Sequence, residues 1–155
     1  MMPIDLDDID RRILRELQKD GRVQNNELAK RVGLSPSPCL RRVKLLEERG
    51  VIDRYVAVVD QAQVGLTMSM FVRVWLLAQD TETIEVFIKA MQRLPEVVEC
   101  YIMLGESDAL LKVVCSDIED YRRFQRTNLT RQNGIQNVKT DVPSQVVKQA
   151  FAIPV

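Results

Sequence analysis

A serine and proline repeat in residues 31–52, RVGLSPSPCLRRVKLLEERGVI, fixes where one helix of this chain begins. Proline lacks a backbone N–H and holds φ near about −65°, so it fits the first turn of a helix and breaks a helix interior. Ser35 or Ser37 can cap the helix while Pro36 or Pro38 takes its first position. The repeat therefore predicts a helix that starts sharply and carries basic side chains from its first turns onward.

Two helical patterns precede this helix. Residues 5–20 repeat isoleucine and leucine at helical spacing, with aspartates at the start and Gly21 after the end. Residues 25–32 form a shorter pattern, and Gly33 permits a tight turn. A helix, a short helix, a glycine turn and a third helix with a basic start are typical of a helix-turn-helix, whose third helix reads the major groove of DNA.

The third helix is expected to have an apolar and a polar face. Leu40, Val43 and Leu46 recur at a spacing of three and are predicted to point into the core. The residues then turned outward are Ser37, Pro38, Arg41, Arg42 and Lys44. Leu45 also falls on the outward side and has no role in this pattern.

Charge is balanced over the whole chain but segregated along it. The 22 basic side chains equal the 22 acidic ones, so net charge alone predicts no partner. Residues 22–54 hold eight basic and four acidic side chains, whereas residues 5–20 hold six acidic and four basic ones. The positive excess thus falls on the stretch that contains the predicted reading helix.

The chain contains no histidine, and its three cysteines, Cys39, Cys100 and Cys115, lie far apart. Histidine is the commonest metal ligand and the usual general base, so we expect no metal, no cofactor and no catalytic residue. The amino terminus is acidic, unlike a signal peptide, and no apolar run approaches the roughly 20 residues that span a bilayer. These features favour a cytoplasmic protein without a membrane partner.

From about residue 63 the pattern changes to strands and helices in the order βαββαβ. The expected elements are a strand in 67–77, a helix in 81–94, strands in 97–104 and 109–116, a helix in 117–129 and a strand in 135–142. This order predicts a ferredoxin-like α+β domain, with two helices on one face of an antiparallel sheet. Both faces of the first strand are largely apolar, so the open face suggests a partner.

The predicted domains are a helix-turn-helix domain in residues 1–62 and a ferredoxin-like domain in residues 63–155. Residues 50–60, GVIDRYVAVVD, are expected to form a strand, either a wing or the connection between the domains. Residues 143–155 form a tail that can add another strand.

Taken in order, these patterns resemble the Lrp/AsnC family of prokaryotic transcription regulators over essentially the whole chain. The resemblance lies in LDDIDRRILRELQKDGR (6–22), NNELAKRVGLSPSPCLRRVKLLEERGVI (25–52), and Gly105 and Asp108 within LGESDALLKV. It implies a winged helix-turn-helix that binds double-stranded DNA, followed by a domain that senses an amino acid. It also implies a homodimer paired through its sheets, which assembles further to a tetramer or octamer.

The resemblance assigns DNA contacts to eight residues. Those implied to face the groove are Ser35, Ser37, Pro38, Arg41 and Arg42, and those implied to contact phosphates are Arg22, Lys44 and Arg54. Phosphate contacts provide affinity and salt dependence, whereas base contacts provide sequence choice. If Arg42 contacts a base, its replacement by alanine is expected to weaken operator binding by about 1 to 3 kcal/mol.

The resemblance also implies an amino-acid site between dimers. Its residues would be Gly105, Glu106, Ser107, Asp108, Gln136 and Thr140. The bare sequence GESD equally fits an ordinary hairpin turn. An amino acid needs a carboxylate or carbonyls for its ammonium and N–H groups for its carboxylate, and glycine permits close backbone approach. Asp108 would either bind the ammonium or hold the loop.

Two other functions remain open from the sequence. One is an effector-blind protein that organises DNA, in which the GESD cleft is vestigial. The other is an enzyme, because siroheme decarboxylases have a similar architecture, although the missing histidine argues against it. The strand sequence TDVPSQVV departs from leucine-responsive members, so leucine is not implied as the effector.

Overall fold

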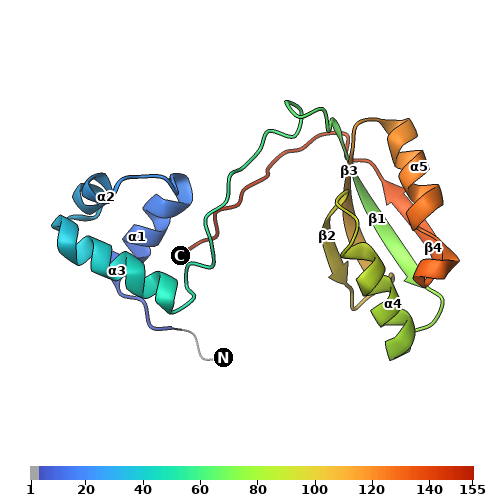
Figure 1. Ribbon diagram of the computed structural model, residues 1–155, viewed down its shortest axis with the longest axis horizontal. Coiled ribbons are helices and arrows are strands. Elements are labelled where there is room, and N and C mark those ends of the chain that lie inside the picture. Colours follow the sequence, from blue (N-terminus) through green and yellow to red (C-terminus); the bar gives the residue numbers. More distant parts are fainter. Residues whose placement is uncertain (1–3) are drawn as a thin grey trace. The chain divides into compact units, whose positions relative to one another are not determined.

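The computed structural model describes residues 4–155. Its helices are α1 (Asp8–Lys19), α2 (Asn25–Val32), α3 (Pro36–Glu48), α4 (Thr81–Met91) and α5 (Ile118–Asn128), with a short 3-10 helix η1 (Arg131–Asn133) (Figure 1). Its strands are β1 (Met68–Leu76), β2 (Val97–Ile102), β3 (Ala109–Cys115) and β4 (Ile135–Asp141). Three helices followed by a βαββαβ order confirm the predicted succession of elements.

The chain divides into two compact units. The first consists of the residues up to Val58 together with Val147–Val155, and the second of Val59–Val146. The last nine residues therefore lie with the first unit, whereas the predicted boundary assigned them to the second. The chain passes from one unit to the other twice.

The first unit packs α1, α2 and α3 around a small core. Its buried side chains are Ile13, Leu14, Leu28, Ala29, Val32, Cys39 and Leu46. Asp7 caps α1 because its Oδ1 accepts hydrogen bonds from the backbone N–H groups of Ile9 and Asp10 at 2.9 and 2.8 Å. Gly33 ends α2 with φ of 76°, which confirms the predicted glycine turn before α3.

The start of α3 resolves the two alternatives in the serine and proline repeat. Ser35 occupies the cap position and Pro36 is the first helical residue. The inward face differs from the prediction, because Leu40 is 44% exposed and Cys39 is fully buried. A spacing of three drifts around a helix that turns every 3.6 residues, whereas Cys39, Val43 and Leu46 follow the true period.

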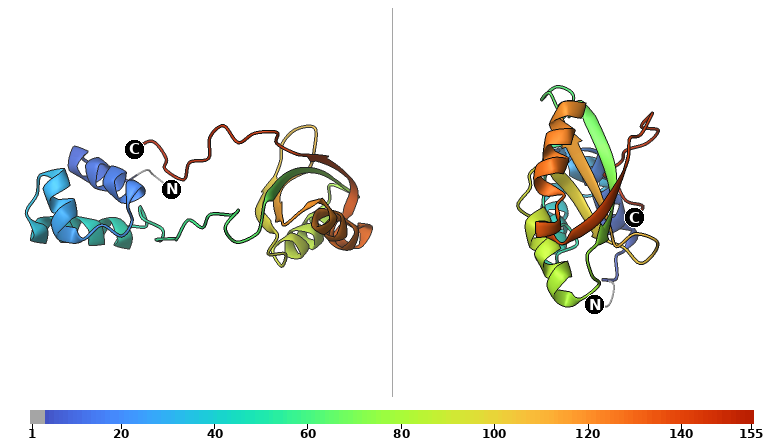
Figure 2. Two further views of the ribbon diagram at one scale, coloured as in Figure 1. Left: turned by 90° about the horizontal axis from the view of Figure 1, so that it is seen from above. Right: turned by 90° about the vertical axis from the view of Figure 1, so that its right-hand side faces the viewer.

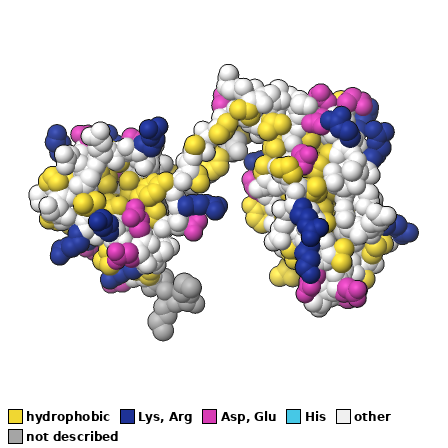
Figure 3. All heavy atoms as spheres, in the orientation of Figure 1, with side chains coloured by type: hydrophobic (Ala, Val, Ile, Leu, Met, Phe, Trp, Pro, Cys, Tyr) yellow, Lys and Arg dark blue, Asp and Glu magenta, His cyan; other side chains and the backbone are white. Residues whose placement is uncertain are grey.

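Two segments that were predicted to form strands do not form strands in the structure. Residues 50–60 and 143–155 belong to no helix or strand, because a strand needs a hydrogen-bonded neighbouring strand and these segments have none among residues 4–155. They nevertheless expose apolar side chains, visible as hydrophobic atoms along the connecting segments in Figure 3, such as Val56 at 68% and Val147 at 89%.

The second unit is an antiparallel sheet in the order β2-β3-β1-β4, with α4 and α5 on one face (Figure 2). The alternation predicted for β1 is confirmed, since Met70, Val72, Val74 and Leu76 are buried in one core with Phe87 and Met91 of α4 and Tyr121 and Phe124 of α5. This arrangement is the predicted ferredoxin-like α+β fold.

The opposite face of the sheet is half-buried and carries two ion pairs. Arg73 of β1 pairs with Asp141 of β4 at 2.6 Å, and Lys112 of β3 pairs with Glu99 of β2 at 3.2 Å. Each pair joins neighbouring strands, so the charges are matched across the face and an apolar partner can cover it at lower cost.

Gly134, between η1 and β4, is a position where a side chain is expected to destabilise the fold. Its φ is 78°, and an added Cβ would lie 3.1 Å from the Thr83 carbonyl oxygen. We expect Gly134→Ala to lower the free energy of unfolding by about 1 to 3 kcal/mol, measured by chemical denaturation. Gly105→Ala is the control, because Gly105 lacks a positive φ and has nothing within 4 Å of an added Cβ. Equal stability of both variants would contradict this strain.

Candidate functional site

The first turns of α3 present hydroxyl and basic side chains to solvent. Ser35, Ser37, Arg41 and Lys44 are exposed, and Pro38 is half-buried. In the part of the chain that the structure describes, neither Arg41 nor Lys44 forms an ion pair. The opposite face of the helix is fixed in the core by Cys39 and Leu46. The helix therefore offers free positive charge on a rigid support.

Arg42 does not share this free surface. Its Nη1 donates to Asp7 Oδ2 and to Asp10 Oδ1, both at 2.7 Å, so it joins α3 to α1. The hydrogen bond to Asp10, followed by that to Asp7, raises the pKa of Arg42. The guanidinium of Arg42, which was predicted to contact a base, is thus held by two carboxylates of the first unit. Residue 42 lies one turn after buried Cys39, and that placement turns its side chain toward α1.

Asp7 serves both helices with one carboxylate. Its Oδ1 caps α1 and its Oδ2 accepts the hydrogen bond from Arg42. The backbone N–H of Asp10 is the largest cause that lowers the pKa of Asp7, and Arg42 lowers it further. The start of α1 and the orientation of α3 therefore depend on the same charged group.

The predicted phosphate contacts outside α3 are also exposed. Arg22 follows α1, and its backbone N–H donates to Asp20 Oδ1 at 3.0 Å. Arg54 follows α3, with its side chain 78% exposed and 3.5 Å from Asp53 Oδ2. Figure 3 shows Lys and Arg side chains standing clear of the first unit's surface. All these guanidinium groups can reach a phosphate without breaking a buried contact.

In the second unit, Asp108 holds the loop between β2 and β3 against the end of β1. Its Oδ2 accepts from the backbone N–H of Leu76, and its Oδ1 accepts from Gln79 Nε2, each at 2.8 Å. Its own backbone N–H donates to the Val74 carbonyl at 2.9 Å. Both carboxylate oxygens therefore have partners within the chain, which favours the loop-holding role over ammonium binding.

Trp75 is a second anchor of this loop that the sequence analysis did not assign. Its Nε1 donates to the Glu106 carbonyl at 2.8 Å. Gly105 and Glu106 are exposed, whereas Ser107 is only 7% exposed. The loop therefore presents a glycine backbone and an exposed carboxylate to solvent. A tryptophan N–H on a half-buried strand face needs a hydrogen-bond acceptor, and this requirement is the sequence feature that could have identified Trp75 as an anchor.

The start of β4 lies at the same end of the sheet as the loop, but Thr140 does not. Trp75 pairs with Asn137, so the neighbouring Gln136 is close to the loop end of β1. Thr140 lies further along β4, and its hydroxyl forms a hydrogen bond with that of Tyr121 on α5. The side chain of Thr140 thus points into the helix-covered face, and within one chain it does not lie beside the loop.

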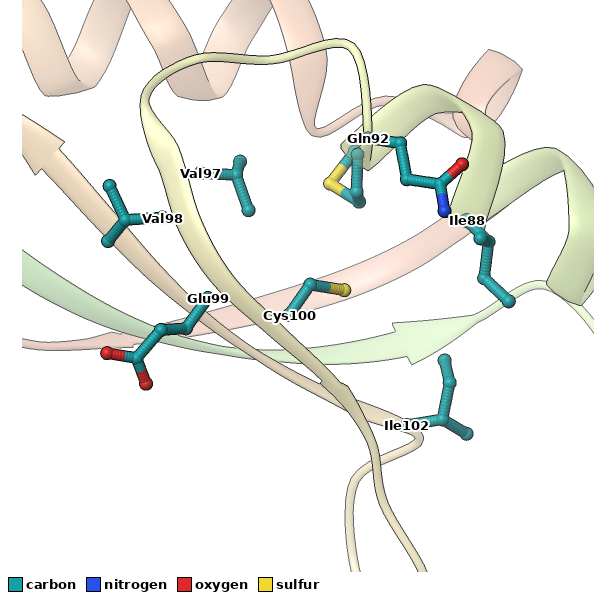
Figure 4. A pocket seen from close by; sticks show the side chains of 8 residues that line it. Ile88, Gln92, Val97, Val98, Glu99, Cys100 and Ile102 are labelled. Atoms are coloured by element: carbon teal, nitrogen blue, oxygen red, sulfur yellow. The ribbon is translucent and has the colours of Figure 1, made fainter. Parts of the chain in front are cut away.

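A groove of about 250 Å³ lies elsewhere in the second unit, between α4 and β2. Figure 4 shows Ile88 and Gln92 at one wall and Cys100 and Ile102 at the other. The full lining is Ile88, Met91, Gln92, Val97, Val98, Glu99, Cys100 and Ile102. Because none of the six predicted effector residues lines this groove, the candidate ligand site rests on the Asp108 loop.

Cys39 and Cys115 are buried, whereas Cys100 is exposed on β2. Burial raises the pKa of all three thiols, and that of Cys115 to about 11, so little reactive thiolate forms near neutral pH. Among residues 4–155, no three His, Cys, Asp or Glu side chains gather as a metal site. The described helices also include none that is both long and apolar enough to cross a membrane.

Comparison with known proteins supports both units. Residues 6–53 match a family described as winged helix-turn-helix DNA-binding, and residues 69–153 match the Lrp/AsnC ligand binding domain. The chain is 43% identical over 146 residues to the leucine-responsive regulatory protein of Escherichia coli (strain K12), covering 94% of this chain and 89% of that one.

Solved structures agree with this result over nearly the whole chain. A transcriptional regulator of Neisseria meningitidis in complex with L-Met superposes with a TM-score of 0.93 at 35% identity, covering 97% of each chain. The AsnC protein of E. coli superposes with a TM-score of 0.86 at 25% identity, covering 96% of this chain and 99% of that one. The named relatives are regulators and not enzymes.

Proposed function

The chain belongs to the Lrp/AsnC family of transcription regulators, and from this premise we propose that it binds specific double-stranded DNA through the start of α3 and responds to an amino acid. It is a ligand-modulated regulator and not an enzyme. The observation that carries the proposal is the free basic and hydroxyl surface on α3, held rigid by a buried opposite face.

We assign the DNA contacts within this proposal by exposure and by the lack of a partly buried ion pair, since the pair of Arg54 with Asp53 is open to solvent. Ser35, Ser37, Pro38 and Arg41 lie on the first turns of α3, where side chains of a reading helix reach base edges. The proposed phosphate contacts are Arg22, Lys44 and Arg54. Arg42 leaves the set of base contacts and becomes the residue that fixes α3 on α1.

The proposed amino-acid site lies at the loop end of β1, between the Asp108 loop and the start of β4. The superposed N. meningitidis regulator binds L-Met, which favours an amino acid as the ligand class. The exposed carboxylate of Glu106 suits the ligand's ammonium, and the backbone at Gly105 allows close approach to the ligand. Gln136 reaches the same end of the sheet, whereas Asp108, Trp75 and Gln79 keep the loop in shape.

The proposal includes a homodimer in the cytoplasm that assembles further to a tetramer or octamer. Support comes from the half-buried open sheet face with its internally matched ion pairs, and from the exposed valines of the connecting segments. Coupling between the ligand and DNA sites would amount to about 1 to 3 kcal/mol, transmitted through the assembly.

The test is a DNA titration on a site selected from a randomised duplex pool, repeated with each of the twenty amino acids. One or a few amino acids should change the DNA affinity and also raise the thermal midpoint, because a ligand at 100 times its dissociation constant stabilises by about 2.7 kcal/mol. DNA binding that no amino acid affects, with unchanged midpoints, would leave an effector-blind DNA-organising protein. Absence of any selected site would refute the proposal.

Salt dependence distinguishes the basic residues of α3. We expect Lys44→Ala to reduce the slope of log affinity against log salt concentration by about 0.9, the value for one lost phosphate contact. Arg42→Gln is the matched comparison, and we expect it to leave the slope unchanged because its guanidinium already binds Asp7 and Asp10. A reduced slope in the Arg42 variant would return Arg42 to the DNA surface.

A further inference from the structure

The carboxyl-terminal residues of the chain lie with the helices of the first unit (Figure 1). They follow β4 of the second unit by only a few residues, since β4 ends at Asp141 and the first unit resumes at Val147. They form no strand or helix, so they are not bound as an added strand of the sheet.

A side chain of α1 binds this tail, residues 147–155, through two hydrogen bonds. Gln18 Nε2 donates to the Ile153 carbonyl at 3.1 Å, and the Ile153 backbone N–H donates to Gln18 Oε1 at 2.7 Å. A glutamine amide carries one acceptor and two donors in a plane, so it can satisfy both backbone groups of a single extended residue. The pair of bonds resembles one rung of an antiparallel ladder.

Gln18 binds the backbone of the tail, and the neighbouring side chains of the tail contribute little to the contact. Ile153 is 67% exposed and Phe151 is 68% exposed, although both are apolar. Only the last residue, Val155, packs against the core of the first unit. This combination of a backbone clamp and one terminal apolar contact is a small docking site and not an extension of the core.

We propose that α1 carries a docking site for the chain's own carboxyl-terminal residues, recognised by Gln18 through the backbone of Ile153 and by the core through Val155. The tail is then a second connection from the last strand of the ligand-binding sheet to the DNA-binding helices. Its regulatory consequence rests on the function proposed above.

The position of Gln18 on α1 makes the connection relevant to DNA reading. Asp10, two helical turns earlier on the same helix, holds Arg42 of the reading helix at 2.7 Å. One rigid helix therefore joins the tail to α3. A ligand that alters the end of β4 can act on the orientation of α3 through this helix, while the linker at residues 53–60 provides the other connection.

Amide hydrogen exchange on the full-length protein tests the docking directly. We expect the Ile153 amide to be protected in the parent and to exchange about five- to tenfold faster in Gln18→Leu, as befits the loss of one modest hydrogen bond. Gln18→Glu keeps the acceptor for that N–H and should stay close to the parent. Gln24→Leu, on an exposed glutamine of the same unit, is the matched control.

An unprotected Ile153 amide in the parent, or equal exchange in parent and Gln18→Leu, would overturn the docking site. Protection that falls on dilution would mean that a second copy supplies the tail, and would overturn docking within one chain. These outcomes do not depend on DNA or ligand, so they remain distinct from failure of the proposed function.

The regulatory consequence has its own measurement, with L-methionine as the probe and the selected DNA site as the target. We expect Gln18→Leu to bind DNA within twofold of the parent without L-methionine, but to lose most of the change in affinity that L-methionine causes in the parent. An unchanged response in the variant would refute coupling through the tail. A parent that responds to no amino acid would refute the proposed function instead, leaving the exchange result to decide the docking.

Discussion

Ile13→Ala is expected to unfold the first unit and abolish DNA binding while the second unit stays folded. Ile13 is fully buried in the core of the three-helix unit, where deleting a large aliphatic side chain costs about 2 to 5 kcal/mol. A core of this size rarely contributes more than about 3 to 5 kcal/mol to the free energy of unfolding, so one substitution can remove the whole stability of the unit. Circular dichroism should show helix loss, and DNA titration should show no specific binding.

Ile4→Ala is the matched control, because the same substitution is made in the same unit at a side chain that is 39% exposed. Its effect should stay within about 0.5 kcal/mol, as for most surface changes. The second unit can be followed by the fluorescence of Trp75, which lies on β1. If the tryptophan signal melted together with the helix signal in Ile13→Ala, the two units would not fold independently and the prediction would fail.

Asp108→Ala is expected to weaken amino-acid binding at least tenfold while leaving ligand-free DNA binding unchanged. The substitution removes two acceptors, one for the Leu76 N–H and one for Gln79, and hydrogen bonds to a charged group contribute about 1.5 to 3 kcal/mol each. Loss of either contact allows the loop to leave its bound shape. Calorimetric titration with L-methionine, or with the amino acid that most raises the thermal midpoint, measures the change.

Asp108→Asn separates loop holding from charge. The amide oxygen of asparagine can still accept from the Leu76 N–H, so ligand binding should remain close to the parent if Asp108 only holds the loop. A loss as large as that of Asp108→Ala would instead place the ligand's ammonium on this carboxylate. Unchanged binding in both variants would remove Asp108 from the site altogether.

The order of elements could be predicted from sequence because each depends on local patterns. The caps, the glycine turn and the periods of 3.6 and two residues are properties of neighbouring positions, so they identified three helices and the βαββαβ domain. The buried face of α3 was harder to predict from the sequence. Leu40 and Cys39 differ by one position, and the prediction chose a spacing of three that included Leu40, whereas the buried side chain is Cys39.

Contacts between distant residues were beyond the sequence patterns. Arg42 appeared to be one more basic side chain on a polar face until α1 brought Asp7 and Asp10 against it. Trp75 reaches a carbonyl 31 residues away, and its role depends on the β1–β3 register. Residues 53–60 have the composition of a strand, but hydrogen bonding requires a neighbour that one described chain does not supply.

The division of the chain has a consequence for the order of events during protein synthesis. The first unit combines two segments that the second unit separates, so α1 is synthesised before the sheet, whereas Ile153, which Gln18 binds, is synthesised after it. The three helices can therefore form while the sheet is still being translated, but their contact with Ile153 must wait until the whole sheet has been made. A fluorescent label attached near Ile153 would accordingly report on the helices of the first unit.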